Sequence, residues 1–181
     1  ASALNSVGIK IISTGGTFSE LKNANIEVKD VSSVTNFPEI LDGRVKTLHP
    51  KIHGGLLNIR NNKKHQKTIN EQKIENIDLL VVNLYPFEDT IKNKSDYKTC
   101  IENIDIGGPA MIRAAAKNHD NVGVIVDPND YNEIINEMND NDLSLTKETL
   151  KKLALKAFAR TAAYDSMISN WLSNELDIPL G

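Results

Sequence analysis

Two short apolar runs constrain the fold of this chain more than any other feature. Residues 77–83 and 122–126 are almost continuously hydrophobic, which is typical of parallel strands that are covered on both faces. A strongly helical segment, residues 146–174, follows the second run. Strands that alternate with helices predict an α/β protein, here a three-layer α/β/α sandwich with a mainly parallel sheet.

Shorter elements complete this pattern. A helical segment over residues 1–7 is expected to end at Gly8, because glycine readily closes a helix. Residues 52–59 contain two adjacent glycines and fit either a helix or a strand. Residues 32–50 show no periodicity, and their apolar side chains favour a packed, functional segment over disorder. The remaining predicted strands cover residues 9–13 and 26–31, and the remaining predicted helices cover residues 18–25, 63–73, 96–104, 110–118 and 128–138.

The size and charge of the chain limit the classes of protein to which it can belong. A chain of 181 residues and 20.0 kDa predicts one domain with a substantial core. The formal net charge of −3 argues against a nucleic-acid-binding surface, so any anion site must be local. The lone Cys100 excludes an intramolecular disulfide. We therefore expect a cytoplasmic protein with no signal peptide, no membrane span and no nucleic-acid partner.

The motif DGRVKTLHP, which begins at Asp42, is the most informative run. Gly43 permits a tight turn, and the residues after it are predicted to be extended. Alternate side chains of an extended segment share a face, so Arg44 and Lys46 are expected to point one way and Val45 the other. Two neighbouring cations, followed by a hydroxyl, suit a bound anion. For an isolated basic pair, a solvated surface turn is the simpler interpretation.

Polar residues also follow the predicted strands. In parallel α/β proteins, ligands bind just outside the carboxyl ends of the strands. The glycines after the first strand let backbone N–H groups approach a phosphate, although a plain turn is an equal alternative, and the run is neither a Walker loop nor a dinucleotide fingerprint. Tyr85, taken alone, is explained more simply as a core residue. The strand ends carry Ser13-Thr14-Gly15-Gly16-Thr17, Asn83-Leu84-Tyr85 and Asp127.

Charged residues flank the helix predicted over residues 110–118. Asp105 precedes its start, and capping of that turn is the simpler local explanation. Arg113 and Lys117 are four residues apart on one helical face, where a solvated surface explains them equally well. None of these residues identifies a site by itself.

The histidines do not predict a metal site. His49 and His53 are four residues apart, a spacing that two zinc ligands on a helix can have. Pro50 and the glycines that follow His53 are expected to interrupt such a helix, and no carboxylate motif accompanies the pair. We therefore predict no metal site here, and the family resemblance described below implies no cofactor.

Seven runs are distinctive when they are taken together. They are Ser13-Thr14-Gly15-Gly16-Thr17, Phe37-Pro38-Glu39, Gly43-Arg44-Val45-Lys46-Thr47-Leu48-His49-Pro50, Asn83-Leu84-Tyr85-Pro86-Phe87, Glu102-Asn103-Ile104-Asp105-Ile106-Gly107-Gly108-Pro109, Ala114-Ala115-Ala116-Lys117-Asn118-His119 and Thr161-Ala162-Ala163-Tyr164-Asp165. They cover nearly the whole chain and resemble the inosine monophosphate (IMP) cyclohydrolase domains of the methylglyoxal-synthase-like superfamily.

The resemblance implies a methylglyoxal-synthase-like fold, a homodimer and closure of a purine ring. In that reaction the carboxamide nitrogen of 5-formamidoimidazole-4-carboxamide ribonucleotide attacks its own formyl carbon, and water leaves. In this family a strand and a Ser-Asp-Lys phosphate loop precede the first helix, and a formyltransferase domain follows. We therefore expect residues 1–181 to form the cyclohydrolase domain of a protein that extends in both directions.

The resemblance also implies roles for individual residues. Lys117 is expected to transfer a proton while oriented with Asp105, and Lys46 to support the developing charge. The expected catalytic residues are Lys117, Asp105, Tyr85 and Lys46. The expected substrate-binding residues are Thr14, Gly15, Gly16, Thr17, Arg44, Val45, Thr47, Asn83 and Ile106.

Two other classes of protein share this fold. A non-catalytic, nucleotide-binding regulatory module would need the phosphate loop but not the combination of Lys46, Tyr85, Asp105 and Lys117. Methylglyoxal synthase should lack the run over residues 43–50. Both alternatives fit the sequence less well than the ring-closing enzyme.

Overall fold

The computed structural model describes residues 1–85, 87–93 and 95–180. The sequence predicts one domain, whereas the contacts divide the chain into two compact units, residues 1–76 and 77–181. Two positions used in the sequence analysis, Pro86 and the last residue, Gly181, lie outside the described residues.

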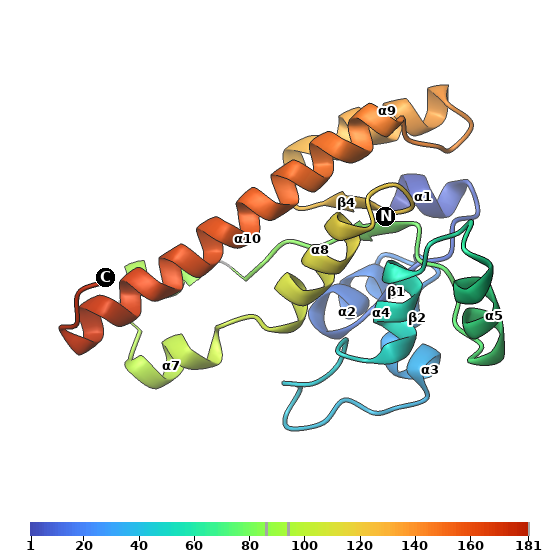
Figure 1. Cartoon of the computed structure of the whole chain (residues 1–181). Helices are drawn as coiled ribbons and strands as arrows, with labels where there is room; N and C mark the ends of the chain where they lie inside the picture. Colours follow the sequence, from blue (N-terminus) through green and yellow to red (C-terminus); the bar gives the residue numbers. More distant parts are fainter. Residues whose placement is uncertain (86, 94, 181) are drawn as a thin grey trace. The chain divides into compact units, whose positions relative to one another are not determined.

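The first unit contains one short parallel sheet and five helices among its described residues. Strands β1 and β2 pair in register, Ile12 with Lys29 and Ser13 with Asp30. Helix α4 packs on α3, and its Ile52 and Leu56 are buried. The elements are α1 (Ser2–Ser6), β1 (Ile12–Ser13), α2 (Gly15–Asn23), β2 (Lys29–Asp30), α3 (Val31–Thr35), α4 (Pro50–Leu57) and α5 (Lys63–Glu71) (Figure 1).

Local signals explain where helix α4 begins. Pro50 is its first residue, a position at which the missing N–H costs nothing, and the His49 Nδ1 accepts the Lys51 N–H at 3.1 Å. Residues 52–59 fitted either a helix or a strand, and the first six of them are helical. The expected interruption at Pro50 and Gly54 was wrong, because proline starts this helix and Gly54 packs within it, against Ile74.

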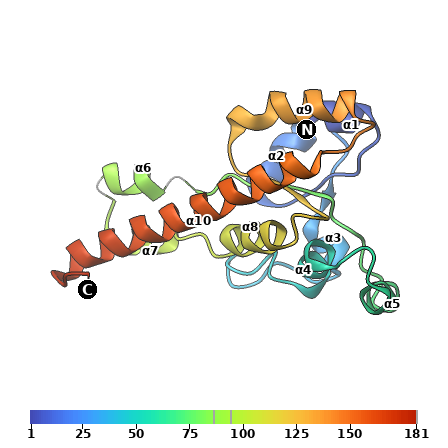
Figure 2. The same cartoon turned by 45° about the horizontal axis from the view of Figure 1, so that its top comes forward.

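The second unit contains a second parallel sheet with helices packed on it. Strand β3 pairs with β4 from Leu79–Gly123 to Val81–Ile125, and both α8 and α10 pack on β4. The elements are β3 (Leu79–Val81), α6 (Phe87–Lys92), α7 (Tyr97–Glu102), α8 (Gly107–Lys117), β4 (Gly123–Ile125), the 3₁₀ turn η1 (Pro128–Asp130), α9 (Tyr131–Asp140) and α10 (Lys147–Leu176). Figure 2 shows α10 continuing past α8 toward α6 and α7.

The two apolar runs that dominate the sequence form the adjacent strands of this second sheet. Val122 and Val124 are fully buried, and Leu80 is nearly so. Gly123 is required between them, because a Cβ there would lie 2.9 Å from Leu79 Cδ1 and 3.0 Å from Leu145 Cδ1. The predicted α/β class with parallel strands is confirmed in both units, although every strand is shorter than predicted.

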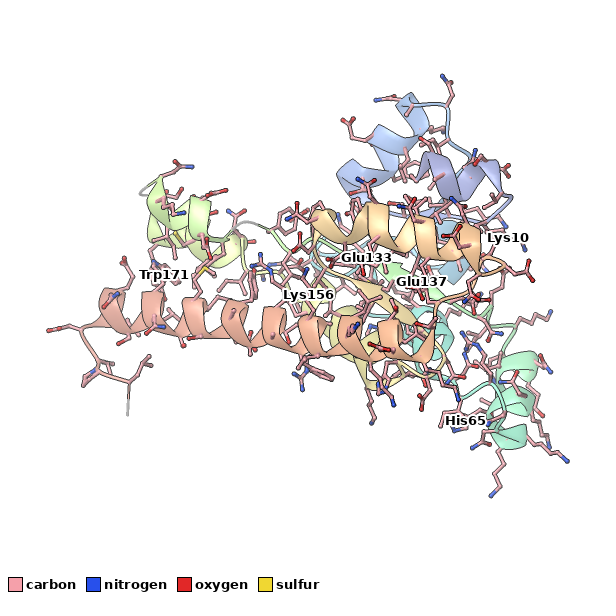
Figure 3. The ribbon with its side chains drawn as sticks, turned by 90° about the horizontal axis from the view of Figure 1, so that it is seen from above. Lys10, His65, Glu133, Glu137, Lys156 and Trp171 are labelled. Atoms are coloured by element: carbon pink, nitrogen blue, oxygen red, sulfur yellow. The ribbon has the colours of Figure 1, made fainter. Side chains whose placement is uncertain are left out.

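An aromatic cluster fastens the far half of α10. Trp171 packs edge-on against Phe87 of α6, with ring centroids 5.4 Å apart, and stacks on Tyr97 of α7 at the same distance. Tyr164 also packs edge-on against Phe87, at 6.3 Å. Figure 3 shows Trp171 on the side of α10 that carries these contacts.

Ion pairs and caps fasten the near half of α10. The Lys156 Nζ lies 2.8 Å from an oxygen of Asp127 and 2.8 Å from both oxygens of Asp130, and Glu137 of α9 accepts the Thr146 N–H at the start of α10 (Figure 3). The hydrogen bond from Lys156 holds the pKa of Asp127 below its usual value. Asp127, expected beside a ligand at a strand end, instead ties η1 to α10.

Among the described residues, no helix is both long enough and apolar enough to cross a membrane.

Candidate functional site

In the first unit, the predicted phosphate loop is the first turn of helix α2. Thr14 is the N-cap, with extended backbone, and the helix begins at Gly15, whose φ is +58°. The expected order, a loop and then a helix from residue 18, was therefore wrong by one turn. The first N–H groups of a helix have no partner inside it and carry a partial positive charge, so this end of α2 suits an anion. Gly15, Gly16 and Thr17 are exposed there.

The turn at Gly43 is confirmed, but the extended segment expected after it is not. Ile40 and Val45 form an isolated antiparallel bridge, and Gly43 between them has a φ of +86°. Beyond Val45 the chain bends and enters α4 at Pro50. Arg44 lies in the turn and is exposed, whereas Thr47 is buried.

Lys46 returns from this bend to the start of α2. A Cβ on Gly43 would lie 2.8 Å from Lys46 Cε, and a Cβ on Gly15 would lie 3.5 Å from Lys46 Nζ. The ammonium is also 3.3 Å from the Glu39 Oε2. Two glycines with positive φ therefore leave the space through which Lys46 reaches the N-terminus of α2.

A cavity of about 360 Å³ lies beside this lysine. That volume falls at the lower end of the range for small-molecule sites, about 300 to 1,000 Å³. One oxygen of the Asp30 carboxylate accepts the Ser32 N–H at 2.8 Å and bonds the Ser32 hydroxyl. Lys46 supplies positive charge to the cavity wall. The lining residues are Thr14, Asp30, Val31, Ser32, Phe37, Pro38, Glu39 and Lys46.

In the second unit, Asn83 and Tyr85 follow strand β3, as predicted. The Asn83 Nδ2 donates to the Tyr131 Oη at 3.0 Å, so a residue at the start of α9 orients its amide. Tyr85 is 62% exposed. Its interpretation as a core residue was therefore wrong, and its ring is available to a ligand.

Asp105 caps the start of α8. Its Oδ1 accepts the Gly108 N–H at 2.8 Å, and its own N–H donates to the Tyr164 Oη at 2.9 Å. A Cβ on Gly108 would clash with the Asp105 Oδ2 and would lie 2.9 Å from Leu84 Cδ2, so only glycine fits there. The capping interpretation is confirmed. Ile106, the next residue, is exposed.

The structure does not bring Lys117 and Asp105 together. Lys117 is the last residue of α8, whereas Asp105 precedes its first residue, Gly107, and a helix rises by about 1.5 Å per residue, so about 15 Å separates its two ends. No ion pair between Asp105 and Lys117 forms within the described ranges. Arg113, on the same helix, lies over the Phe158 ring at 5.6 Å.

His49 and His53 both belong to the local structure of α4. His49 is the N-cap of α4, and burial lowers the pKa of His53 within the same helix. In the part of the chain that the structure describes, no three His, Cys, Asp or Glu side chains are grouped as metal ligands.

Sequence reasoning missed three partners of the predicted site residues. Glu39 pairs with Lys46, Tyr131 holds Asn83, and Tyr164 holds the Asp105 backbone. Glu39 and Tyr164 lie in two of the seven distinctive runs, so these runs could have identified both residues as partners of the site.

Comparison with known families finds two matched segments, whose boundary differs from that between the two compact units. Residues 1–110 match the family described as MGS-like domain, and residues 115–179 match the family described as AICARFT/IMPCHase bienzyme. The first match covers more than half of the chain.

Curated relatives are similar over almost the whole chain. The bifunctional purine biosynthesis protein PurH of Rhizobium rhizogenes is 56% identical over 178 residues, which are 98% of this chain and 33% of that protein. PurH of Brucella ovis is 56% identical over 177 residues, again 98% of this chain and 33% of that protein. The chain thus spans about a third of the length of these relatives.

A solved structure confirms the fold class. The structure described as "Crystal structure of ForH" has a TM-score of 0.80 and 31% sequence identity, and it covers 93% of this chain and 88% of that chain. Its likeness extends over both matched segments. The chain therefore belongs to the MGS-like domain family, in the group that includes the bifunctional purine biosynthesis proteins PurH.

Proposed function

We propose that this chain carries IMP cyclohydrolase activity, the closure of the purine ring that completes IMP. The observation that carries the proposal is 55–56% identity to PurH proteins over 98% of the chain. In the natural protein we expect a formyltransferase domain to accompany it, because the relatives are bifunctional and about three times as long.

The proposed reaction needs orientation and proton transfer. The carboxamide nitrogen of 5-formamidoimidazole-4-carboxamide ribonucleotide forms a bond to the formyl carbon and loses one proton. The formamide nitrogen loses a second proton, and the formyl oxygen leaves with both as water. Both reacting groups belong to one molecule, so holding them in a reactive geometry supplies much of the acceleration. No electron is transferred, and the balance requires no oxidant or reductant.

The first unit is proposed to hold the ribonucleotide phosphate. The exposed first turn of α2 offers N–H groups from Gly15, Gly16 and Thr17, and Lys46 ends beside it. Arg44 adds a guanidinium, which binds phosphate through paired donors. Thr14 lines the cavity, while Val45 and Thr47 fix the turn that presents Arg44 and Lys46.

In this scheme the Lys46 ammonium has two alternative partners, the Glu39 carboxylate and the substrate. Without a nucleotide, this carboxylate is 3.3 Å from the ammonium and offsets the charge. Solvent weakens this partly exposed ion pair. A phosphate or a developing oxyanion can therefore replace Glu39 as the partner of Lys46.

The second unit is proposed to act on the base. Asn83 presents an amide that Tyr131 orients, and Tyr85 and Ile106 present exposed apolar surface on which a base can rest. Asp105 has a carboxylate oxygen for a substrate N–H. Lys117 is the proposed proton-transfer residue. Its distance from Asp105 means that each residue must be tested separately.

We also propose a homodimer in the cytoplasm. Leu155, 73% exposed, and the half-exposed Phe158 provide apolar surface on α10 that a second copy can cover. The lone Cys100 is buried and free, which fits a reducing compartment. Analytical ultracentrifugation tests the dimer: a monomer at micromolar concentration would rule it out.

The experiment that tests the proposed sites is a crystal structure with IMP. We expect the phosphate at the first turn of α2, with contacts to Lys46 and Arg44 of the same unit. A phosphate bound away from α2 would contradict the assignment. Binding in this position without any turnover would instead favour the regulatory module.

A further inference from the structure

Tyr164 is a buried tyrosine to which the reaction scheme gives no role. It lies in the middle of α10, is 1% exposed, and packs edge-on against Phe87. Its hydroxyl accepts the Asp105 N–H at 2.9 Å and donates to the Asn103 carbonyl at 3.4 Å. The two bonds span 59 and 61 residues of sequence. A distant side chain thus holds the backbone of the turn that carries Asp105.

The Asp105 carboxylate is fixed from the other side as well. Its Oδ1 accepts the Gly108 N–H, and its Oδ2 occupies the space that a Cβ on residue 108 would need. Oδ2 accepts no hydrogen bond from the residues in the described ranges. Only one of the two carboxylate oxygens is therefore bonded by α8.

The hydroxyl of Tyr164 can keep both hydrogen bonds at neutral pH. Burial, followed by the nearby Asp105 charge, raises the pKa of Tyr164 above its usual value. The group therefore stays protonated and acts as donor and acceptor at once. Phenylalanine at this position would keep the ring packing on Phe87 but would leave the Asp105 N–H and the Asn103 carbonyl without these partners.

We propose that Tyr164 is a positioning residue that sets the Asp105 carboxylate for ring closure. The inference rests on the proposed function, because it assumes that Asp105 contacts the substrate. Tyr164 touches no substrate itself. It links the packing of α10 to the turn in front of α8, so that Oδ2 is presented in one direction.

The first test is Tyr164→Phe in the protein at its natural length, assayed by ultraviolet absorbance for IMP formation. Loss of one well-placed hydrogen bond predicts a decrease in kcat of about tenfold. The KM and the affinity for IMP should change less than about twofold, because the phosphate contacts are untouched. Tyr97→Phe is the matched control: it removes a hydroxyl from the same aromatic cluster, one that bonds none of the described residues, and should keep wild-type kcat.

The second test separates positioning from general stability by a double-mutant cycle. If Tyr164 acts through Asp105, Tyr164→Phe should have no further effect on kcat in an Asp105→Ala background. Losses that multiply would overturn the proposal, as would a wild-type kcat in Tyr164→Phe beside an impaired Asp105→Ala. A wild-type kcat in Asp105→Ala would overturn instead the role of Asp105 in the proposed function.

A third measurement does not depend on how the variants fold. Amide hydrogen exchange of the wild-type protein should show a protected Asp105 N–H, because Tyr164 holds it. Rapid exchange at Asp105, beside protected amides in α8, would overturn the contact on which the proposal stands.

Discussion

At the scale of single residues, Asp105 and Lys117 carry the proposed chemistry from opposite ends of α8. We predict that Asp105→Ala and Lys117→Ala each lower kcat by about 10² to 10⁴-fold, the usual contribution of an acid–base group. The affinity for IMP, measured by calorimetry, should fall much less. An effect of Lys117→Ala on KM alone would contradict its role in proton transfer.

Arg44 has a different role, and its substitution should be distinguishable. Its guanidinium lies in the exposed turn at Gly43, where it can hold an anion. Arg44→Ala should therefore weaken IMP binding about tenfold or more, since a hydrogen bond to a charged group contributes about 1.5 to 3 kcal/mol. The kcat at saturating substrate should stay within about twofold. Loss of kcat with unchanged affinity would assign Arg44 to the chemistry instead.

Gly108 is the residue at which structure and activity are most directly linked. A Cβ there must displace both Asp105 and Leu84. Gly108→Ala should lower the free energy of unfolding by about 1 to 3 kcal/mol, as overpacking does, and should also lower kcat. Gly123→Ala is the matched control, because its Cβ would crowd Leu79 and Leu145 but not Asp105. Equal kcat in the two folded variants would separate Gly108 from the site.

Sequence patterns identified these residues better than they identified their partners. The Asp105 carboxylate accepts from the N–H of Gly108, only three residues away, so this cap follows from local sequence. The contacts of Asn83 with Tyr131 and of Asp105 with Tyr164 span 48 and 59 residues. Such contacts depend on how distant helices pack, which periodicity does not encode.

At the scale of secondary-structure elements, helices were predicted more closely than strands. The helix predicted over residues 146–174 is α10, Lys147–Leu176, with Thr146 as its cap. The strand predicted over residues 26–31 is only β2, Lys29–Asp30. Helices α3 and α6 were not predicted, and α3 lies where an irregular segment was expected from residue 32. Caps mark the end of a helix in the local sequence, whereas a strand ends where its partner ends.

The ion pairs between η1 and α10 predict a pH-dependent contribution to stability. Hydrogen bonds to Lys156 lower the pKa of Asp127, and the same bonds, first to Asp127 and then to Asp130, raise the pKa of Lys156. A lowered carboxyl pKa stabilises the fold above the ordinary value of 3.8 and loses its effect as the pH falls below it. A raised lysine pKa stabilises below 10.5 and loses its effect above it.

Lys156→Met should therefore lower the thermal unfolding temperature more at pH 7 than at pH 2.5. Lys151→Met is the control, because Lys151 lies on the same helix and makes no ion pair among the described residues. A decrease of the same size at both pH values would show that the Lys156 stem, rather than its charge, stabilises α10.

At the scale of the whole molecule, we expected one domain, whereas the chain divides into two compact units. Length alone gave that expectation, and length does not show where contacts are sparse. The parallel strands were identified, but their division into one pair per unit depends on partners that are 17 residues apart in the first sheet and 44 in the second, as between Ile12 and Lys29 and between Leu79 and Gly123.

The central claim is that this molecule closes the purine ring. The direct measurement is IMP formation from 5-formamidoimidazole-4-carboxamide ribonucleotide, followed by ultraviolet absorbance with a metal chelator present, for the wild type and Lys117→Ala at natural length. We predict turnover by the wild type with chelator and a loss of about 10² to 10⁴-fold in the variant. Equal rates in the two proteins, or a wild-type rate no greater than that of the uncatalysed reaction, would contradict the account.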